Sequence, residues 1–116
     1  DADIWSNYSV VLWLLGRHPE ALNSIEQALS LNASSPQAWQ NRGAILVALG
    51  RYEAAQASYA QAVQLDDQNA LAWASLGVIQ LQLSQGETGL EALEKALALD
   101  PEQPLAQRAL EQLSSE

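Results

Sequence analysis

The sequence contains no cysteine, which excludes disulfide bonds, thiolate zinc sites and a cysteine nucleophile. It contains a single histidine, His18, so a histidine metal cluster is excluded and a serine triad would have only this one base. No glycine-rich phosphate loop is present, and Asp66-Asp67 lacks the spaced oxygen ligands and the glycine of a calcium loop. We therefore predict a protein that is not an enzyme and that binds no metal and no cofactor.

Basic residues are scarce. Five basic residues stand against fourteen acidic ones, which gives a formal net charge of -9 at pH 7. Contacts to a nucleic acid backbone would lack their main cationic donors, so we expect neither nucleic acid nor an anionic membrane surface as a partner. The longest apolar run, residues 10–15, is far shorter than the roughly twenty residues of a membrane span. We expect a soluble chain without membrane insertion.

Methionine is also absent, and the sequence begins at Asp1. We interpret this as excision from a longer polypeptide or as processing, and removal of an export signal would leave the same trace. The compartment is therefore open at this point, with the cytoplasm favoured.

What the sequence does contain is a repeat. Tryptophans at positions 5, 39 and 73 are spaced by 34 residues, and alanines at positions 28, 62 and 96 keep the same spacing. A period of this size is typical of stacked arrays, in which one unit cannot bury its apolar face alone. The apolar periodicity and the turn residues within each unit indicate two helices joined by a short turn. The predicted helices cover residues 1–15, 18–31, 36–49, 52–65, 70–83, 87–99 and 104–114.

Three motifs identify the family that the chain resembles: Trp73-x-x-Leu76-Gly77, Gly50-x-Tyr52-x-x-Ala55-x-x-x-Tyr59-x-x-Ala62 and Asp100-Pro101. They resemble the tetratricopeptide repeat. The resemblance covers residues 2–103 as three repeats, about 2–35, 36–69 and 70–103, followed by a C-terminal capping helix at 104–114. It implies an all-α fold, a right-handed superhelical solenoid of helix-turn-helix units, and a function that is generally not enzymatic.

The sequence departs from the family pattern at several positions. Tyr8 and Ser9 replace the Leu-Gly pair in the first copy, Arg42 replaces the leucine in the second, and Gln80 stands at a large apolar position in the third. Gln107 stands where the next tryptophan is expected. We expect Arg42 either to pair with a nearby acid or to extend its charged end to water.

The resemblance also implies that a partner binds on a concave face lined by the first helix of each repeat. Carried over by register, this partner-binding groove comprises Asn7, Val10, Trp13, Leu14, Gln37, Gln40, Asn41, Ala44, Val47, Ala48, Leu71, Ala74, Val78 and Leu81. Some members of the family hold acidic chaperone tails with a clamp of lysines, arginine and asparagines, of which only Asn41 is present here. A bound carboxylate would be desolvated without a compensating cation, so we predict no carboxylate clamp. The apolar strip favours a partner protein that offers an apolar or amphipathic segment.

Residues 1–15 carry apolar side chains on nearly every side of the predicted helix, and such a helix is expected to be covered on all sides. Two functions therefore remain open. The chain is either a protein–protein interaction module that binds a peptide or helical segment, or an assembly element. In the second case it would self-associate as a homo-oligomer, or stack within a longer repeat protein, through Ile4, Tyr8 and Val11. As an alternative to partner binding, the apolar groove residues could pack against neighbouring helices of the same array.

Overall fold

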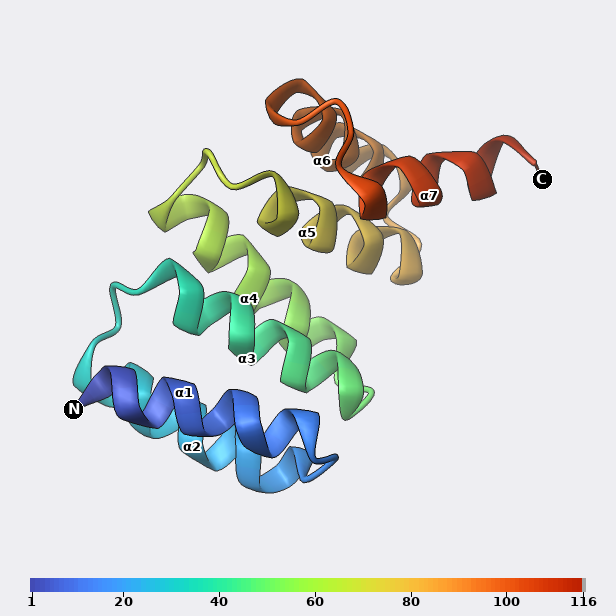
Figure 1. Ribbon diagram of the computed structural model, residues 1–116. Helices are drawn as coiled ribbons and strands as arrows, with labels where there is room; N and C mark the ends of the chain where they lie inside the picture. Colours follow the sequence, from blue (N-terminus) through green and yellow to red (C-terminus); the bar gives the residue numbers. More distant parts are fainter. Residues whose placement is uncertain (116) are drawn as a thin grey trace. The chain divides into compact units, whose positions relative to one another are not determined.

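The computed structural model describes residues 1–115, which form helices joined by short turns (Figure 1). The helices are α1 (Ala2–Leu14), α2 (His18–Leu31), α3 (Pro36–Ala48), α4 (Tyr52–Leu65), α5 (Ala70–Gln82), α6 (Gly86–Leu99) and α7 (Pro104–Ser114). They belong to two compact units, Asp1–Leu65 and Asp66–Glu116. The first unit contains the hairpins α1–α2 and α3–α4, and the second contains the hairpin α5–α6 followed by α7. The predicted all-α class is confirmed.

The helices predicted at residues 1–15, 36–49 and 70–83 are each one residue too long at the C-terminal end. Leu15, Leu49 and Leu83 are cap residues whose backbone N–H groups reach back into the last helical turn. Each of these helices ends before its cap because the residue after the cap, Gly16, Gly50 or Ser84, has a positive φ. The helix predicted to start at residue 87 starts at Gly86, and the first helix starts at Ala2 because Asp1 is its N-cap.

Each hairpin turns at a residue in the left-handed backbone region. Gly16 has a φ of 79° and Gly50 a φ of 73°, a region that glycine enters at no steric cost. In the third hairpin Ser84 takes this position with a φ of 63°, which strains a residue that has a Cβ. All three turns are closed by the same backbone bond, in which Arg17, Arg51 and Gln85 donate to the carbonyls of Leu12, Leu46 and Gln80 at 2.9, 2.9 and 2.8 Å.

Four helices begin at side-chain caps that recur every 34 residues. The side-chain oxygens of Asp1, Ser35, Asn69 and Gln103 accept the N–H of the residue three positions later, at 3.0, 3.1, 3.2 and 2.8 Å. Each cap satisfies one of the backbone donors that a helix start leaves without a partner. The first helix of each hairpin therefore begins at a residue whose side chain caps it, and so does α7.

The side chains at the tryptophan positions bind the preceding turn. Trp39 and Trp73 donate their indole N–H to a carbonyl six residues earlier, that of Ala33 at 2.8 Å and that of Asp67 at 2.9 Å. Gln107 stands at the next position of this register, and its side-chain amide donates to the carbonyl of Pro101 at 3.0 Å. At this position the indole ring is thus absent, but the hydrogen bond to the preceding turn is kept.

Small residues allow the two helices of a hairpin to approach closely. A Cβ added at Gly43 would lie 2.6 Å from Cε1 of the Tyr59 ring, and one at Gly77 would lie 2.8 Å from Cγ of Leu93. The first hairpin has Ser9 and Ile25 at this register, and both are fully buried. The first hairpin therefore accommodates a side chain at the glycine position, with isoleucine opposite it in place of tyrosine or leucine.

The core of each unit is built from apolar residues of both the first and the second helices of its hairpins, and in the second unit also from α7. In the first unit one cluster of buried apolar residues comprises Leu12, Ala21, Ile25, Ala28, Leu29, Ala38 and Ile45, with Leu22, Trp39 and Leu49 packed against it. In the second unit Ala74, Leu93, Ala96 and Ala106 are buried, so α7 packs on α5 and α6 through Ala106. The opposite side of α7 carries exposed polar side chains, those of Gln107, Arg108, Glu111 and Gln112.

Candidate functional site

In the first unit, the predicted groove residues lie on α1 and α3, which contact each other. Trp13, Leu14 and Val47 are 37%, 70% and 37% exposed, although all three are apolar. Val10 and Ala44 are half-buried, and Ala48 is exposed. These positions all fall in the C-terminal halves of α1 and α3, so each of the two helices has an exposed apolar surface there.

The N-terminal halves of the same two helices are polar. Gln37 donates its side-chain amide to Oδ1 of Asn41 at 2.9 Å, and Asn41 donates its own amide to Oγ of Ser6 at 3.3 Å. Asn7 is exposed, whereas Gln40 is buried. Asn41, the residue that matches the carboxylate-clamp pattern, therefore has both ends of its side chain in hydrogen bonds.

In the second unit, Leu71 is 46% exposed, and Val78 and Leu81 are partly buried. Ala74 is fully buried among Leu93, Ala96 and Ala106, so it offers no surface to a partner. An open hollow of about 570 Å³ lies between α5 and α7, and a smaller one of about 330 Å³ adjoins it at Val78, Ala109 and Gln112. The larger hollow is lined by Val78, Leu105, Arg108, Ala109, Glu111, Gln112 and Ser115.

The groove predicted from the sequence does not include these α7 residues. The 34-residue register was the available signal, because Leu105, Arg108 and Gln112 follow Leu71, Ala74 and Val78 by one period. Arg108 brings a cation to this hollow, and its Nε donates to the carbonyl of Pro104 at 3.4 Å. The predicted groove positions on α1, α3 and α5 carry no basic residue, whereas the hollow between α5 and α7 has Arg108.

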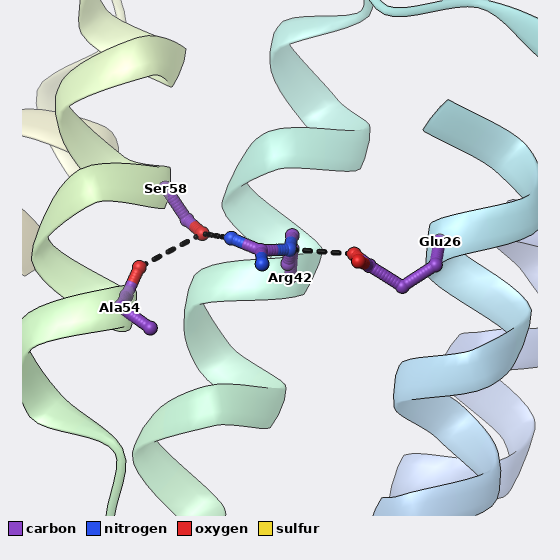
Figure 2. A network of polar contacts seen from close by, with 4 residues as sticks. All are labelled: Glu26, Arg42, Ala54 and Ser58. Carbon is purple, nitrogen blue, oxygen red and sulfur yellow. Dashed lines mark hydrogen bonds and ion pairs between the residues drawn. The ribbon is translucent and has the colours of Figure 1, made fainter. Parts of the chain in front are cut away.

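Arg42 forms the main polar network of the first unit (Figure 2). Its Nε lies 2.6 Å from a carboxylate oxygen of Glu26 on α2, and its Nη1 donates to Oγ of Ser58 on α4 at 2.7 Å. Ser58 in turn donates to the carbonyl of Ala54 at 3.1 Å, and the guanidinium lies 5.8 Å from the centre of the Trp39 ring. The expectation that Arg42 pairs with an acid is confirmed, and the arginine joins three helices in place of an apolar contact.

A second ion pair lies at the start of α2. Arg17 donates through Nε to the Glu20 carboxylate at 2.8 Å, and its second nitrogen contacts the other carboxylate oxygen. This hydrogen bond lowers the pKa of Glu20 below its ordinary value and raises the pKa of Arg17. Both side chains are about half exposed, so solvent screens the pair.

The outer face of α1 differs from the corresponding face of α3. On α3, Ala38 and Ile45 are 2% and 1% exposed, because α2 packs against this helix. Their counterparts one period earlier, Ile4 and Val11, are 66% and 51% exposed. Within the described residues no helix lies against this face of α1, so its cover by upstream repeats or by a second copy of the chain stays a prediction.

Metal and membrane sites can be assessed for residues 1–115. No three His, Asp or Glu side chains of this part of the chain gather as a metal site would require. Its helices are too short or too polar to cross a bilayer. His18 lies in the first turn of α2 and is half-buried.

Three family models match the sequence. One described as a TPR repeat matches residues 43–84, and two described as tetratricopeptide repeats match residues 11–55 and 70–103. The chain belongs to the tetratricopeptide repeat family. The models follow one another along residues 11–103, so the landmarks spaced by 34 residues are those of tetratricopeptide repeats.

Solved tetratricopeptide repeat structures share the fold. The first TPR of Spaghetti (RPAP3), bound to the HSP90 peptide SRMEEVD, has a TM-score of 0.93 and 20% identity, covering 98% of this chain and 90% of that one. The Sgt2 TPR domain from Aspergillus fumigatus has a TM-score of 0.91 and 23% identity, covering 98% and 77%. YrrB, a TPR protein with an unusual peptide-binding site, has a TM-score of 0.88 and 27% identity, covering 96% and 57%. The predicted tetratricopeptide solenoid is confirmed.

A search of curated proteins found no significant match. The helical repeat fold is nevertheless one of protein–protein interaction, and solved neighbours bind peptides.

Proposed function

We propose that this tetratricopeptide repeat protein is a non-enzymatic interaction module that binds an apolar or amphipathic segment of a partner protein along the first helices of its repeats. The observation that carries the proposal is the exposure of Trp13, Leu14 and Val47 on neighbouring first helices. Large apolar side chains that stay in water over two adjacent helices are typical of a surface that another chain covers. An amphipathic helix or an extended apolar segment suits such a surface.

The proposed contact surface keeps the predicted groove residues with two changes. Ala74 is buried, so it shapes the surface from beneath instead of touching the partner. Leu105, Ala109 and Arg108 of α7 join Val78 and Leu81, because they line the hollows beside α5. The polar ends of α1 and α3, at Asn7 and Gln37, would orient the bound segment by hydrogen bonds.

The test is a selection of helical peptides on the immobilised chain, followed by titration of the best binder. We expect enriched peptides with apolar residues at helical spacing, and loss of binding on Trp13→Ala and on Val47→Glu while the helix content measured by circular dichroism persists. Gln64→Ala, at an exposed position of α4, is the matched control that leaves binding unchanged. Peptide binding that survives both groove substitutions would contradict the proposal.

We also propose that this surface lacks a carboxylate clamp, unlike a surface built to hold a free C-terminus. A clamp of this kind needs several cations, whereas Arg108 on α7 is the one basic residue of the proposed surface. No Lys or Arg occupies the register positions on α1, α3 and α5, and both ends of the Asn41 side chain are engaged. The peptide SRMEEVD, which the first TPR of Spaghetti binds, is a direct probe. We expect no measurable binding of this peptide, and no change when the C-terminus of a selected binder is amidated. YrrB supports the idea that peptides bind this fold in more than one way.

A second candidate function is assembly through the outer face of α1. The contrast between Val11 and its buried counterpart Ile45 favours it, because α3 shows that a helix of this register is normally covered. Sedimentation of the chain and of Val11→Glu over a range of concentrations tests self-association. A wild-type mass that rises with concentration, and a monomeric variant, would support it. A wild type that stays monomeric throughout would exclude a homo-oligomer.

A further inference from the structure

A hollow of about 270 Å³ opens between α1 and α2 on the side of α1 away from the groove residues. It lies among two aromatic side chains, a carboxylate, two amides and a serine hydroxyl. These belong to Trp5, Tyr8, Glu20, Asn23, Ser24 and Gln27. None of the described residues that line it is basic, although its polar groups offer several oxygen acceptors.

Ser24 gives this hollow an unsatisfied hydrogen-bonding group. The residue is only 3% exposed, and its hydroxyl oxygen is buried and has no hydrogen-bond partner among the described residues. A buried hydroxyl without a partner costs free energy, which a ligand that completes its hydrogen bonds would recover. The lining of the hollow thus includes a serine whose buried hydroxyl has no hydrogen-bond partner among the described residues.

In the second hairpin, the serine at the equivalent position does have a hydrogen-bond partner. One period later, Ser58 occupies the position of Ser24 and Trp39 that of Trp5. There the guanidinium of Arg42 donates to Ser58 at 2.7 Å and lies 5.8 Å from the Trp39 ring centre, with Glu26 as its counter-ion (Figure 2). The first hairpin has the serine and the tryptophan but carries Tyr8 in place of the arginine.

The surrounding residues of the first hairpin make its hollow still better suited to a cation. At the positions where the second hairpin has two alanines, Ala54 and Ala57, the first has Glu20 and Asn23, each with a side-chain oxygen. Tyr8 and Trp5 provide aromatic faces, against which a planar guanidinium stacks well. The net charge of -9 adds a long-range attraction for positive groups.

The third hairpin supplies an instructive contrast. Its corresponding hollow has Ala92 at the serine position and is lined by the chain's own cation, Lys95, beside Glu91. The second and third hairpins therefore each bring a basic side chain to this place, whereas the first does not.

The geometry points to a binding site in the first hairpin for the arginine side chain of a partner protein. The guanidinium enters between Trp5 and Tyr8, donates to Ser24 and takes Glu20 as its counter-ion, sharing that carboxylate with Arg17. The site lies on a different side of α1 from the proposed groove, so an experiment that refutes one of the two proposals leaves the other intact. It gives the partner that covers the exposed outer face of α1 a specific anchor.

The experiment uses N-acetyl-arginine amide as the probe and N-acetyl-citrulline amide, its uncharged isostere, as the control. The readouts are the NMR signals of the Trp5 indole N–H and the Ser24 backbone amide during titration. We expect saturable shifts of both signals with the arginine probe, in the weak range open to a single side chain, and none with citrulline. Equal binding of citrulline, or no saturable binding of arginine, would overturn the assignment.

Substitutions locate the site. Ser24→Ala should weaken binding of the arginine probe about tenfold, the size of a lost hydrogen bond to a charged group. Ser58→Ala is the matched control in the second hairpin and should leave the dissociation constant unchanged. Glu20→Gln provides a second variant that also weakens binding, so the result does not depend on Ser24→Ala alone. Trp13→Ala, which removes a groove residue, should have no effect, and unchanged affinity in both site variants would refute the inference.

Discussion

Gly43 permits the close contact between α3 and α4, and Gly43→Ala should therefore destabilise the protein. The added Cβ would lie 2.6, 2.7 and 2.8 Å from three atoms of the Tyr59 ring, closer than real carbon atoms approach. Tyr59 is buried, so the ring cannot simply swing into solvent. Overpacking of this kind costs about 2–3 kcal/mol. The gain in helix propensity from glycine to alanine offsets about 1 kcal/mol, which leaves a net loss of about 1–2 kcal/mol.

The first hairpin suggests the compensating change. At the same register it has Ser9 opposite Ile25, and both are fully buried. In a Tyr59→Ile background, Gly43→Ala should therefore no longer clash and should stabilise the protein by up to about 1 kcal/mol through helix propensity. The difference between the two backgrounds is the coupling energy of the pair, about 2–3 kcal/mol.

Urea unfolding followed by far-ultraviolet circular dichroism measures these differences as shifts in the transition midpoint. Gly86→Ala is the matched control, because an added Cβ there would meet nothing within 4 Å. It should be neutral or mildly stabilising. The packing argument would be refuted if Gly43→Ala behaved like Gly86→Ala, or if its effect were the same with tyrosine and with isoleucine at position 59.

Further substitutions at four positions test other features of the structure. Ser84→Gly should stabilise by about 1 kcal/mol by removing the strain of a positive φ, and Gly50→Ser should destabilise by a similar amount in the same unfolding assay. Gln107→Ala should cost about 0.5–1 kcal/mol through loss of its hydrogen bond, whereas Gln107→Trp should restore the tryptophan bond and cost nothing. Arg17→Ala should raise the pKa of Glu20 towards its ordinary value in an NMR titration; because the pair lowers that pKa, its stabilisation is present at neutral pH and fades as the pH falls.

The 34-residue period predicted the helices well because the residues that begin and end a helix recur in each repeat. Gly16 and Gly50 mark the turns, and Ser35 and Asn69 mark helix starts, so each boundary was recoverable to within a residue. The periodicity did not show that the amide of Gln107 would replace an indole N–H. That substitution depends on where the carbonyl of Pro101 lies in space.

The candidate site was less predictable, because exposure depends on neighbours that lie far away in the sequence. Trp13, Leu14 and Val47, assigned by register to the partner-binding groove, are exposed in the structure. Ala74 was assigned to the same surface, yet α6 and α7 cover it. The ion partner of Arg42 could not be named either, because Glu26 lies on another helix and is brought close only by packing.

The bonds of Trp39, Trp73 and Gln107 to the turn before them have a consequence for how such a chain can change in length. Each donor and its acceptor are six residues apart, and each cap and its amide are three apart, so every joint is contained within a short stretch of sequence. Duplication or deletion of any 34 consecutive residues therefore rebuilds a complete joint at the new boundary. Duplication or deletion of 33 or 35 residues would shift the register at the boundary by one residue. A cap or a packed side chain would then no longer lie opposite its partner. The hydrogen bonds at the turns thus set the unit in which genetic rearrangement can lengthen or shorten this protein.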